Sequence, residues 1–391
     1  MAVINRIADF QDDMTAWRRD LHQHPELGLE EHRTSQVVQE KLRAFGVDEI
    51  ITGIAGTGVV GVIRAGNADR AIGLRADMDA LPIVEDTGAP YASVNPGVMH
   101  ACGHDGHTTM LLGAARYLAE TRRFDGTVYL IFQPAEEGKG GGRIMVQEGL
   151  FERFPMQQVY GMHNWPTLPA GTFGWRNGPT MAATASIEIN LTGKGAHGAY
   201  PHHGVDPILV AAAIVQGLQS IVARNVDPVY PAVITIGHIA AGSTHNVIPE
   251  TVRMLGTARW FEPKVGDVLE NGVRRLATSI AEGFGARAEV DYFRNYPATV
   301  NDPDATALAR HAASTIVGKE RVTHLDQPTM GAEDFAFMLN AKQGNYIMLG
   351  AGRGKSDANV HHPKYDFNDE ILSTGASYWA TLAEQLLART A

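Results

Sequence analysis

Apolar residues recur along the first half of this chain with two periods, one typical of strands and one typical of helices. Short apolar runs that fit buried strands occupy residues 58–63, 71–74, 127–132 and 158–162. Apolar residues spaced three or four positions apart predict helices at residues 4–23, 30–45 and 108–122. Because these strands and helices alternate, the pattern predicts an α/β fold with a mixed, mostly parallel sheet and flanking helices.

The pattern changes near residue 185. Residues 186–191 alternate between apolar and polar positions, which predicts a half-exposed strand. A helix, two strands, a helix and a strand are then predicted at residues 207–224, 232–239, 252–260, 263–284 and 286–293. The order βαββαβ is that of a small ferredoxin-like domain. The α/β pattern resumes with helices at 304–317 and 370–388, so we expect residues 185–296 to be inserted into a domain formed by 1–184 and 297–391.

Composition narrows the class of protein. The 391 residues are 44% hydrophobic and 19% charged, which fits a globular enzyme of two domains. The formal net charge of −10 argues against a nucleic-acid partner. The single cysteine excludes an internal disulfide, which fits a reducing cytoplasm. We see no signal peptide and no apolar stretch of membrane-spanning length, so we expect a cytoplasmic protein without a membrane partner.

Residue types that bind metals are densest within Met99–His107. This stretch contains three histidines, an aspartate and the only cysteine of the chain, Cys102. Thiolate, imidazole and carboxylate groups are the protein ligands of zinc and related metals. Gly103 and Gly106 allow the backbone to turn these groups toward one point. We expect a loop that enters the helix at 108–122. The alternative is a buried thiol beside solvated histidines.

Polar residues also follow three of the predicted strands. They are Asp77 and Asp79 after residues 71–74, Glu136 and Glu137 after residues 127–132, and His163 after residues 158–162. Because the carboxyl ends of parallel strands meet at one edge of a sheet, we expect these side chains to face one site. Of two adjacent carboxylates, one can bind a metal while the other moves protons. The alternatives are turn chemistry before Pro82 for the aspartates and a charged helix N-terminus for the glutamates. The polar loop His22–Gly28 is either a helix end or an edge of the site.

These motifs resemble, in their order, those of a known family. The matching stretches are Arg18–His22, Pro25–Gly28, Leu74–Pro82, Met99–His107, Gln133–Gly138, Gly161–Asn164, Gly193–Pro201, Asn246–Glu250, Gly331–Phe335 and His361–Asp366. The chain resembles the aminoacylase, carboxypeptidase G and hippurate hydrolase metallopeptidases, within the subfamily of bacterial hippurate hydrolases and plant indole-acetyl-amino-acid hydrolases. The resemblance covers essentially the whole chain. It implies a zinc-peptidase-like catalytic domain with an inserted lid and dimerisation domain.

The resemblance implies two divalent metal ions (zinc, manganese, nickel or cobalt) at the C-terminal edge of the sheet. Carried over by position, their ligands are Cys102, His104, Glu137, His163 and His361. Cys102 would bridge the two ions where other branches of the family use an aspartate. Those branches have a metal-binding histidine where this chain has Arg75, and we assign the missing imidazole to His104. The resemblance favours His361 over its neighbour His362.

The resemblance also implies catalytic and substrate-binding residues. Glu136 would be the general base. Asp77 belongs to the catalytic set, although the histidine that it orients in other branches is absent here. His197 resembles a lid histidine that hydrogen-bonds the tetrahedral oxyanion. Asn246 and Arg259 resemble lid groups that grip the substrate carboxylate, and a guanidinium suits both oxygens of that group. The alternative for Asn246 and Arg259 is a structural role at strand ends.

The implied reaction is hydrolysis of an N-acyl amino acid to a carboxylic acid and the free amino acid. A dipeptidase or a deacetylase of acetylated amino acids would use the same site, and a metal-dependent binding protein without catalysis is an alternative of another class. The implied partners are a small-molecule substrate and a second copy of the chain. We expect the strand Ser186–Leu191 to be exposed at a sheet edge and to pair in the dimer, with His197 acting in the active site of the partner subunit.

Overall fold

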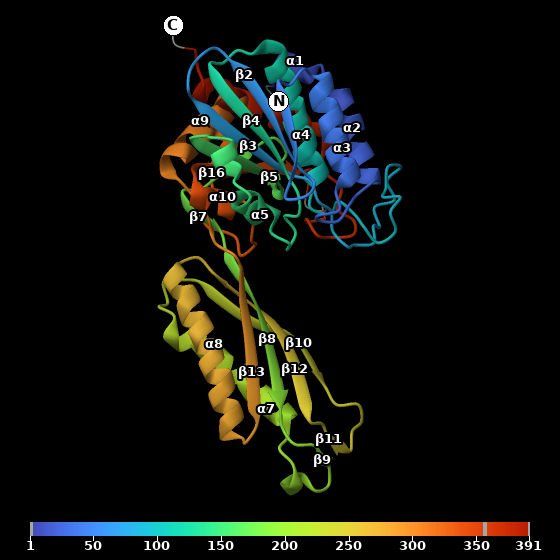
Figure 1. The fold of residues 1–391 in the computed structure, drawn as a ribbon, viewed down its shortest axis with the longest axis vertical. Coiled ribbons are helices and arrows are strands. Elements are labelled where there is room, and N and C mark those ends of the chain that lie inside the picture. Colours follow the sequence, from blue (N-terminus) through green and yellow to red (C-terminus); the bar gives the residue numbers. More distant parts are fainter. Residues whose placement is uncertain (1–2, 355–357, 390–391) are drawn as a thin grey trace. The chain divides into compact units, whose positions relative to one another are not determined.

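A computed structural model of the chain describes residues 3–354 and 358–389. The chain divides into two compact units. Unit 1 comprises Met1–Thr180, Thr299–Pro328 and Asp334–Ala391. Unit 2 comprises Met181–Ala298 and Thr329–Glu333. Figure 1 traces both units along the chain, and each has its own hydrophobic core.

Unit 1 is built on an eight-stranded sheet with the order β1-β2-β4-β3-β5-β16-β6-β15. Its strands are β1 (Glu49–Ile54), β2 (Gly58–Ala65), β3 (Ala71–Asp77), β4 (Gly126–Gln133), β5 (Gln158–Pro169), β6 (Phe173–Trp175), β15 (Val322–His324) and β16 (Gln343–Gly352). The central strands β4, β3, β5 and β16 are parallel neighbours, whereas β2 pairs antiparallel with both β1 and β4. A separate short ladder joins β7 (Gly178–Met181) to β14 (Thr299–Asn301). The predicted mixed, mostly parallel α/β sheet is confirmed.

Helices flank this sheet. The α-helices of unit 1 are α1 (Asn5–Ala8), α2 (Gln11–Gln23), α3 (His32–Ala44), α4 (His104–Thr121), α5 (Gly141–Gln147), α6 (Leu150–Arg153), α9 (Pro303–Val317), α10 (Ala336–Ala341) and α11 (Leu372–Leu386). Helices α4 and α11 pack against each other and are buried along most of their length. Helices α2 and α3 lie beside α4 (Figure 1).

Two helix predictions differ from the structure. The helix predicted at 4–23 is interrupted at Asp9 and Phe10, which separate α1 from α2. Helix α4 begins at His104, so His104 and His107 lie in its first turn and not in a preceding loop. Gly103, with a φ of +93°, supplies the left-handed residue at which the loop ends. Asp105 in the first turn favours this earlier start, because a negative charge is stabilising near a helix N-terminus.

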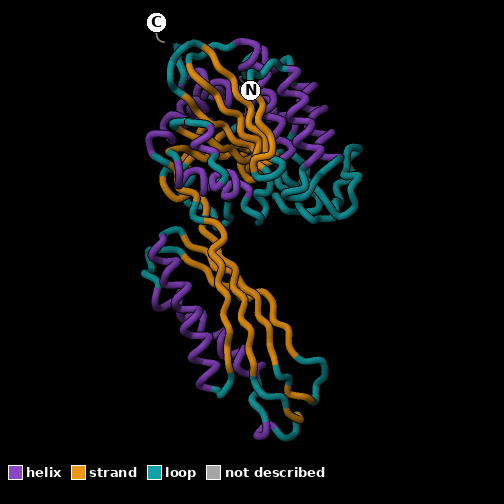
Figure 2. The backbone as a smooth tube through the Cα atoms, viewed as in Figure 1, coloured by secondary structure: helices purple, strands orange, loops and turns teal. Residues whose placement is uncertain are grey.

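Unit 2 has the predicted βαββαβ order. Its elements are β8 (Ala183–Thr192), β9 (Ala196–His197), α7 (Pro207–Ser220), a π-helical turn (Ile221–Asn225), β10 (Ala232–Ala241), β11 (Val247–Ile248), β12 (Thr251–Trp260), α8 (Pro263–Gly283) and β13 (Arg287–Tyr296). The main sheet has the order β10-β12-β8-β13, and α7 and α8 pack against each other and against it (Figure 2). Residues at alternate positions of β8, such as Ile187 and Ile189, face this core.

The sheet order contradicts one prediction. Strand β8, which contains Ser186–Leu191, is paired on both sides, with β12 and with β13. The period of two that suggested an edge arises because one face of a central strand is exposed and the other is covered by helices. The edge strands are β10 and β13.

Helix α7 bears on the membrane prediction. Among the described residues, the segment Pro207–Asn225 is long and apolar enough to cross a membrane by length and composition, so the expectation that no stretch reaches that length is wrong. A core helix passes the same test, and about 33% of this window is buried. Val210, Ile214 and Leu218 belong to the hydrophobic core of unit 2, so we assign α7 to that core.

Candidate metal centre

The five predicted metal ligands come from four places in unit 1. Cys102 precedes α4 and His104 is its first residue. Glu137 lies in the turn after β4, His163 lies in β5, and His361 follows β16. The strands β4, β5 and β16 belong to the parallel centre of the sheet, so the segments that follow them leave at the same edge. The sheet therefore gathers residues that are up to 259 positions apart, as in Cys102 and His361.

These ligands form two groups that share one residue. Possible ligand atoms of Cys102, His104 and His163 lie within 4.8 Å of one another. The same holds for Cys102, Glu137 and His361. His362 is not in either group, and its Nδ1 accepts a hydrogen bond from the backbone N–H of Lys364. The shared thiol is the arrangement expected of a bridging ligand.

Two of the imidazoles are fixed with one nitrogen directed away from the backbone. The Nδ1 of His104 donates to the carbonyl oxygen of Asp79 at 2.9 Å, and the Nδ1 of His163 donates to the carbonyl oxygen of Asn164 at 2.7 Å. A carbonyl oxygen only accepts hydrogen bonds, so both Nδ1 atoms carry a proton. In each ring Nε2 is left to act as a ligand, and that of His163 lies 3.4 Å from the Cys102 sulfur.

Burial and neighbouring charges shift the pKa values of the predicted ligands. Burial, and then the charge of Glu137, raises the pKa of Cys102. Its contacts with Cys102 and Glu137 raise the pKa of His361 to about 10. Burial lowers the pKa of His163 well below its ordinary value, and the charge of His107 adds to this effect. The site thus combines a thiol, imidazoles and a carboxylate that lie so close together that the charge of each one shifts the pKa of its neighbours.

The donor set fits divalent metal ions. His104 Nε2 and Glu137 Oε1 are buried and form no hydrogen bond among the described residues. Glu137 Oε1 lies 3.1 Å from His361 Nε2, but this contact lacks hydrogen-bond geometry. Buried polar atoms are normally hydrogen-bonded. Two buried atoms without a hydrogen bond that face one thiol therefore fit a site for a bound cation. Sulfur, nitrogen and oxygen donors together suit zinc and its first-row neighbours.

Glu136 lies beside these groups. Its carboxylate is within 4.8 Å of the ligand atoms of His104 and Glu137. Its Oε1 accepts a long hydrogen bond of 3.3 Å from the backbone N–H of Asp334, and the residue is 7% exposed. The adjacent glutamates therefore differ in their surroundings, because Glu137 faces Cys102 and His361 whereas Glu136 does not belong to that group.

Asp77 lies behind the ligands and contacts charged groups. Its carboxylate accepts hydrogen bonds from Arg75 Nη1 at 2.7 Å and from His107 Nδ1 at 2.5 Å. It lies 3.7 Å from His104 Nε2. Arg75 also binds Gln133 and Asp334, so its guanidinium links β3, β4 and the turn before α10. Burial would raise the pKa of Asp77, but the nearby positive charges, led by that of His104, hold it well below its ordinary value.

The predicted substrate-binding residues lie in unit 2 and are separated within it. His197 in β9 pairs with Val247 in β11, and Gly198 N–H donates to the Asn246 carbonyl oxygen at 2.8 Å. Arg259 lies near the other end of β12. Eight residues separate Thr251 from Arg259 along that strand, which corresponds to about 26 Å. His197 and Asn246 therefore form one pair, and Arg259 stands apart from them in the same chain.

Comparisons with known proteins agree with this geometry. The sequence profile of peptidase family M20/M25/M40 matches residues 73–385. The chain is 40% identical over 387 residues to the hippurate hydrolase of Campylobacter jejuni, covering 99% of this chain and 100% of that relative. This chain belongs to peptidase family M20/M25/M40.

Other relatives in the family are also similar along their whole length. The N-acetylcysteine deacetylase of Bacillus subtilis is 38% identical, covering 96% of this chain and 97% of the relative. The IAA-amino acid hydrolase ILR1-like 4 of Arabidopsis thaliana is 39% identical, covering 97% of this chain and 87% of the relative. A solved structure, the YXEP protein of Bacillus subtilis, described as a dinuclear metal binding peptidase, has a TM-score of 0.84 and 35% identity, covering 97% and 99% of the two chains.

The sequence did not reveal the side chains that hold the predicted metal ligands in place. The sequence places Asp79 near a strand end but gives no sign of its contact with His104. His107 and Asn164 lie in the predicted motifs, but nothing in the sequence indicated that they contact each other. The signal available was the density of polar residues in the two motifs, which does not distinguish ligands from their supports.

The segment His22–Gly28, predicted as a loop, begins inside α2, because His22 and Gln23 are the last residues of that helix. Two of its side chains contact neighbouring helices. His22 donates to Asp105 at 2.8 Å and to Glu85 at 3.3 Å. Although burial opposes protonation, these carboxylates raise the pKa of His22 to about 9. Glu26 accepts hydrogen bonds from the first backbone N–H groups of α3. Of the two interpretations left open for this loop, the structural one describes both side chains.

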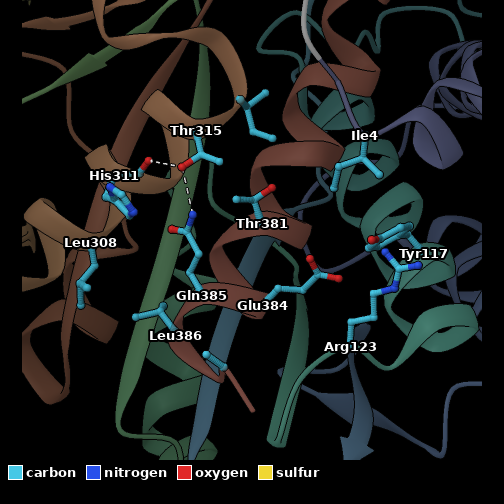
Figure 3. A pocket seen from close by; sticks show the side chains of 12 residues that line it. Ile4, Tyr117, Arg123, Leu308, His311, Thr315, Thr381, Glu384, Gln385 and Leu386 are labelled. Atoms are coloured by element: carbon cyan, nitrogen blue, oxygen red, sulfur yellow. Dashed lines mark hydrogen bonds between the residues drawn. The ribbon is translucent and has the colours of Figure 1, made fainter. Parts of the chain in front are cut away.

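A further cavity lies away from the ligands. It has a volume of about 710 Å³ and is lined by residues of α4, α9 and α11, including Tyr117, His311 and Glu384 (Figure 3). None of the five predicted metal ligands lines it. Volume alone therefore does not identify the site of chemistry in this chain, and the metal-ligand geometry does.

Proposed function

We propose that this chain is a metal-dependent amidohydrolase that cleaves the amide bond of N-acyl amino acids, giving a carboxylic acid and the free amino acid. The observation that carries the proposal is the pair of three-residue groups that share Cys102, with Glu136 beside them. The hippurate hydrolase and N-acetylcysteine deacetylase relatives support the substrate class, because hippurate and N-acetylcysteine are both amino acids with an acylated nitrogen.

We assign one metal ion to Cys102, His104 and His163, and the other to Cys102, Glu137 and His361. When bound, the two divalent ions would lower the pKa of a water and polarise the amide carbonyl. Zinc, manganese, nickel and cobalt all suit these donors. A chain with one cysteine and no internal disulfide fits a reducing compartment, so we place the enzyme in the cytoplasm.

Glu136 moves protons in this proposal. Its carboxylate takes a proton from the attacking water and delivers it to the amide nitrogen as the bond to the acyl carbon breaks. The position of its carboxylate, within 4.8 Å of the ligand atoms of His104 and Glu137, supports this role, because a base must lie beside the metal-bound water. Asp77 keeps the buried side of the site charged and ordered through Arg75 and His107.

Arg259 is the group that we propose for the substrate carboxylate. It is half-buried, and its Nη1 contacts the hydroxyls of Thr184 and Thr257. Among the described residues, no carboxylate pairs with it. Burial lowers its pKa, which is the effect of desolvating a cation that has no counter-ion. A substrate carboxylate would supply that counter-ion with two oxygens for one guanidinium.

His197 is placed to donate a hydrogen bond. The Ala199 backbone N–H donates to its Nδ1 at 3.0 Å, so the proton of the neutral ring lies on Nε2. An exposed Nε2–H is a suitable donor to an oxyanion. Asn246 precedes the start of β12, and about 26 Å of that strand separates Thr251 from Arg259, so we infer that the two sets serve different substrates within one chain.

We therefore propose a homodimer in which His197 and Asn246 serve the active site of the partner subunit. Strand β10 is the edge that we expect to pair, because residues Gly237–Ala241 are exposed along it. An unpaired edge presents backbone groups with which another chain can pair, and a two-fold dimer would cover both copies alike.

A mixed dimer tests this arrangement. Glu136→Gln subunits are combined with His197→Ala subunits, each nearly inactive alone. If His197 acts in the partner's site, the heterodimer has one site with both defects and one with neither, and activity recovers toward half of wild type per heterodimer. No recovery after proven subunit exchange, or full activity of a strict monomer, would contradict the arrangement.

Steady-state turnover tests the proposed reaction. The metal-loaded enzyme is assayed on hippurate, acetylated amino acids, indole-acetyl conjugates and dipeptides, with release of the free amino acid as the readout. We expect turnover on acylated amino acids that a chelator abolishes and added metal restores. Preference for dipeptides would favour the dipeptidase alternative, and preference for acetylated substrates the deacetylase alternative. Absence of turnover on all four classes would favour a binding protein.

A further inference from the structure

Asp79 contacts one ligand of the first metal position. Its carbonyl oxygen lies 2.9 Å from His104 Nδ1, and its carboxylate Oδ1 lies 3.2 Å from the same atom. Both oxygens accept, so the imidazole N–H is shared between them and the ring cannot rotate without losing both contacts. This fixes the tautomer that leaves Nε2 available for a metal.

The same carboxylate contacts the second metal position. Its Oδ2 accepts a hydrogen bond of 2.9 Å from the backbone N–H of Glu137. Glu137 belongs to the group with Cys102 and His361, whereas His104 belongs to the group with Cys102 and His163. One side chain that is 1% exposed therefore holds a ligand from each group.

We propose that Asp79 is a positioning residue that sets the geometry of both metal positions at once. The proposal rests on the two-metal site of the proposed function. It predicts that loss of the Asp79 carboxylate lowers the affinity for both metal ions. Loss of a single ligand other than Cys102 would mainly lower the affinity for one of them.

Asp77 cannot take this part, although it lies two residues earlier. Its oxygens are engaged by Arg75 and His107, and its distance of 3.7 Å is to His104 Nε2, the atom that a metal would use. In this chain the imidazole comes from α4, and the carboxylate that reaches its Nδ1 is Asp79.

The test compares Asp79→Asn with Glu31→Gln. Asparagine keeps the shape of aspartate, but its NH₂ group cannot accept, so one of the two side-chain contacts is lost and the other is no longer made by a charged carboxylate. The His104 N–H then keeps the Asp79 carbonyl oxygen, whereas the Glu137 N–H has no second acceptor from Asp79. Glu31 is a matched control, because it is also fully buried and holds a backbone N–H of the same turn, that of Ala135 at 2.8 Å. Its second partner is the Thr57 hydroxyl, and neither partner is a proposed ligand.

Metal content and cobalt spectra are the readouts. Metal per chain is measured by mass spectrometry during titration of metal-free protein with zinc. Spectra of the cobalt-loaded protein report thiolate and imidazole coordination independently of activity. We expect Asp79→Asn to bind both equivalents of zinc 10- to 100-fold more weakly, with altered cobalt absorption. Glu31→Gln should retain wild-type affinity and spectrum, even if it lowers stability.

Three outcomes would overturn the proposal. Asp79→Asn could bind two equivalents with wild-type affinity and spectrum. It could weaken only one equivalent, which would leave Asp79 serving a single position. It could also weaken zinc no more than Glu31→Gln does, which would make the effect one of general stability. Failure of the wild-type protein to bind two metals would instead refute the proposed function.

Discussion

Gly103 stands between two proposed ligands, and replacing it with alanine tests whether the close packing there supports the site. Its φ of +93° lies in the left-handed region. A Cβ at this position would lie 2.4 Å from Asn164 Oδ1 and 2.9 Å from the Tyr365 hydroxyl oxygen. Both residues are buried, and Asn164 Nδ2 donates to that hydroxyl at 2.7 Å. Neither group can move without breaking this bond.

A second glycine serves as a matched control for the expected loss of folding stability. Gly46 has a φ of +76°, and a Cβ there would meet nothing within 4 Å. Gly46→Ala should therefore cost only the backbone strain, about 1–2 kcal/mol. Gly103→Ala should cost that strain and a further ~1–3 kcal/mol for overpacking. Both glycines lie in unit 1, so the same unfolding transition reports both.

Urea unfolding of the metal-free variants, followed by circular dichroism, measures the difference. The metal content of the native variants is measured in parallel. We expect Gly103→Ala to lose more stability than Gly46→Ala and to lose metal and activity together, because the backbone between Cys102 and His104 must shift. Gly46→Ala should keep both metal and activity. Equal losses of stability in the two variants, or normal metal content in Gly103→Ala, would refute the steric reasoning.

Three further predictions concern charged and reactive groups. Glu136→Gln should lower kcat by about a thousandfold or more with metal retained, whereas Glu137→Gln should lose metal; the reverse pattern would exchange the two roles. Cys102, the only cysteine, should resist alkylation in the metal-loaded enzyme and react after chelation, and equal labelling would argue against a thiolate ligand. His22 has a pKa raised from its ordinary 6.5 to about 9, so its contribution, on the order of 3 kcal/mol, is fully present below pH 6.5 and is lost as the pH rises through 9. The stability difference between wild type and His22→Gln should shrink over that range, and a constant difference would contradict this.

The sequence indicated the proposed ligands because they are chemically unusual and grouped in short motifs. Cys102 and His104 are two positions apart, and Glu136 and Glu137 are adjacent, so their density was visible without a fold. Their supports were not visible. Asp79 reaches His104 across 25 positions, and His107 reaches Asn164 across 57. Such contacts depend on where strands and helices end in space. The spacing of residues along the chain does not predict those positions.

The periods of apolar residues determined most helices and strands, since each element buries one face and that face repeats with the geometry of the element. The period could not give the order of strands in a sheet. Strand β8 reads as a half-exposed strand whether it is central or at an edge, and only its pairing with β12 and β13 placed it in the centre. The spacing of apolar residues also did not predict the first residue of α4. That residue depends on the left-handed conformation of Gly103 and on Asp105 in the first turn. The sequence by itself thus determined the elements and the chemistry of the site. Tertiary structure decided which neighbours each element and each ligand has, because those contacts join residues that are distant along the chain.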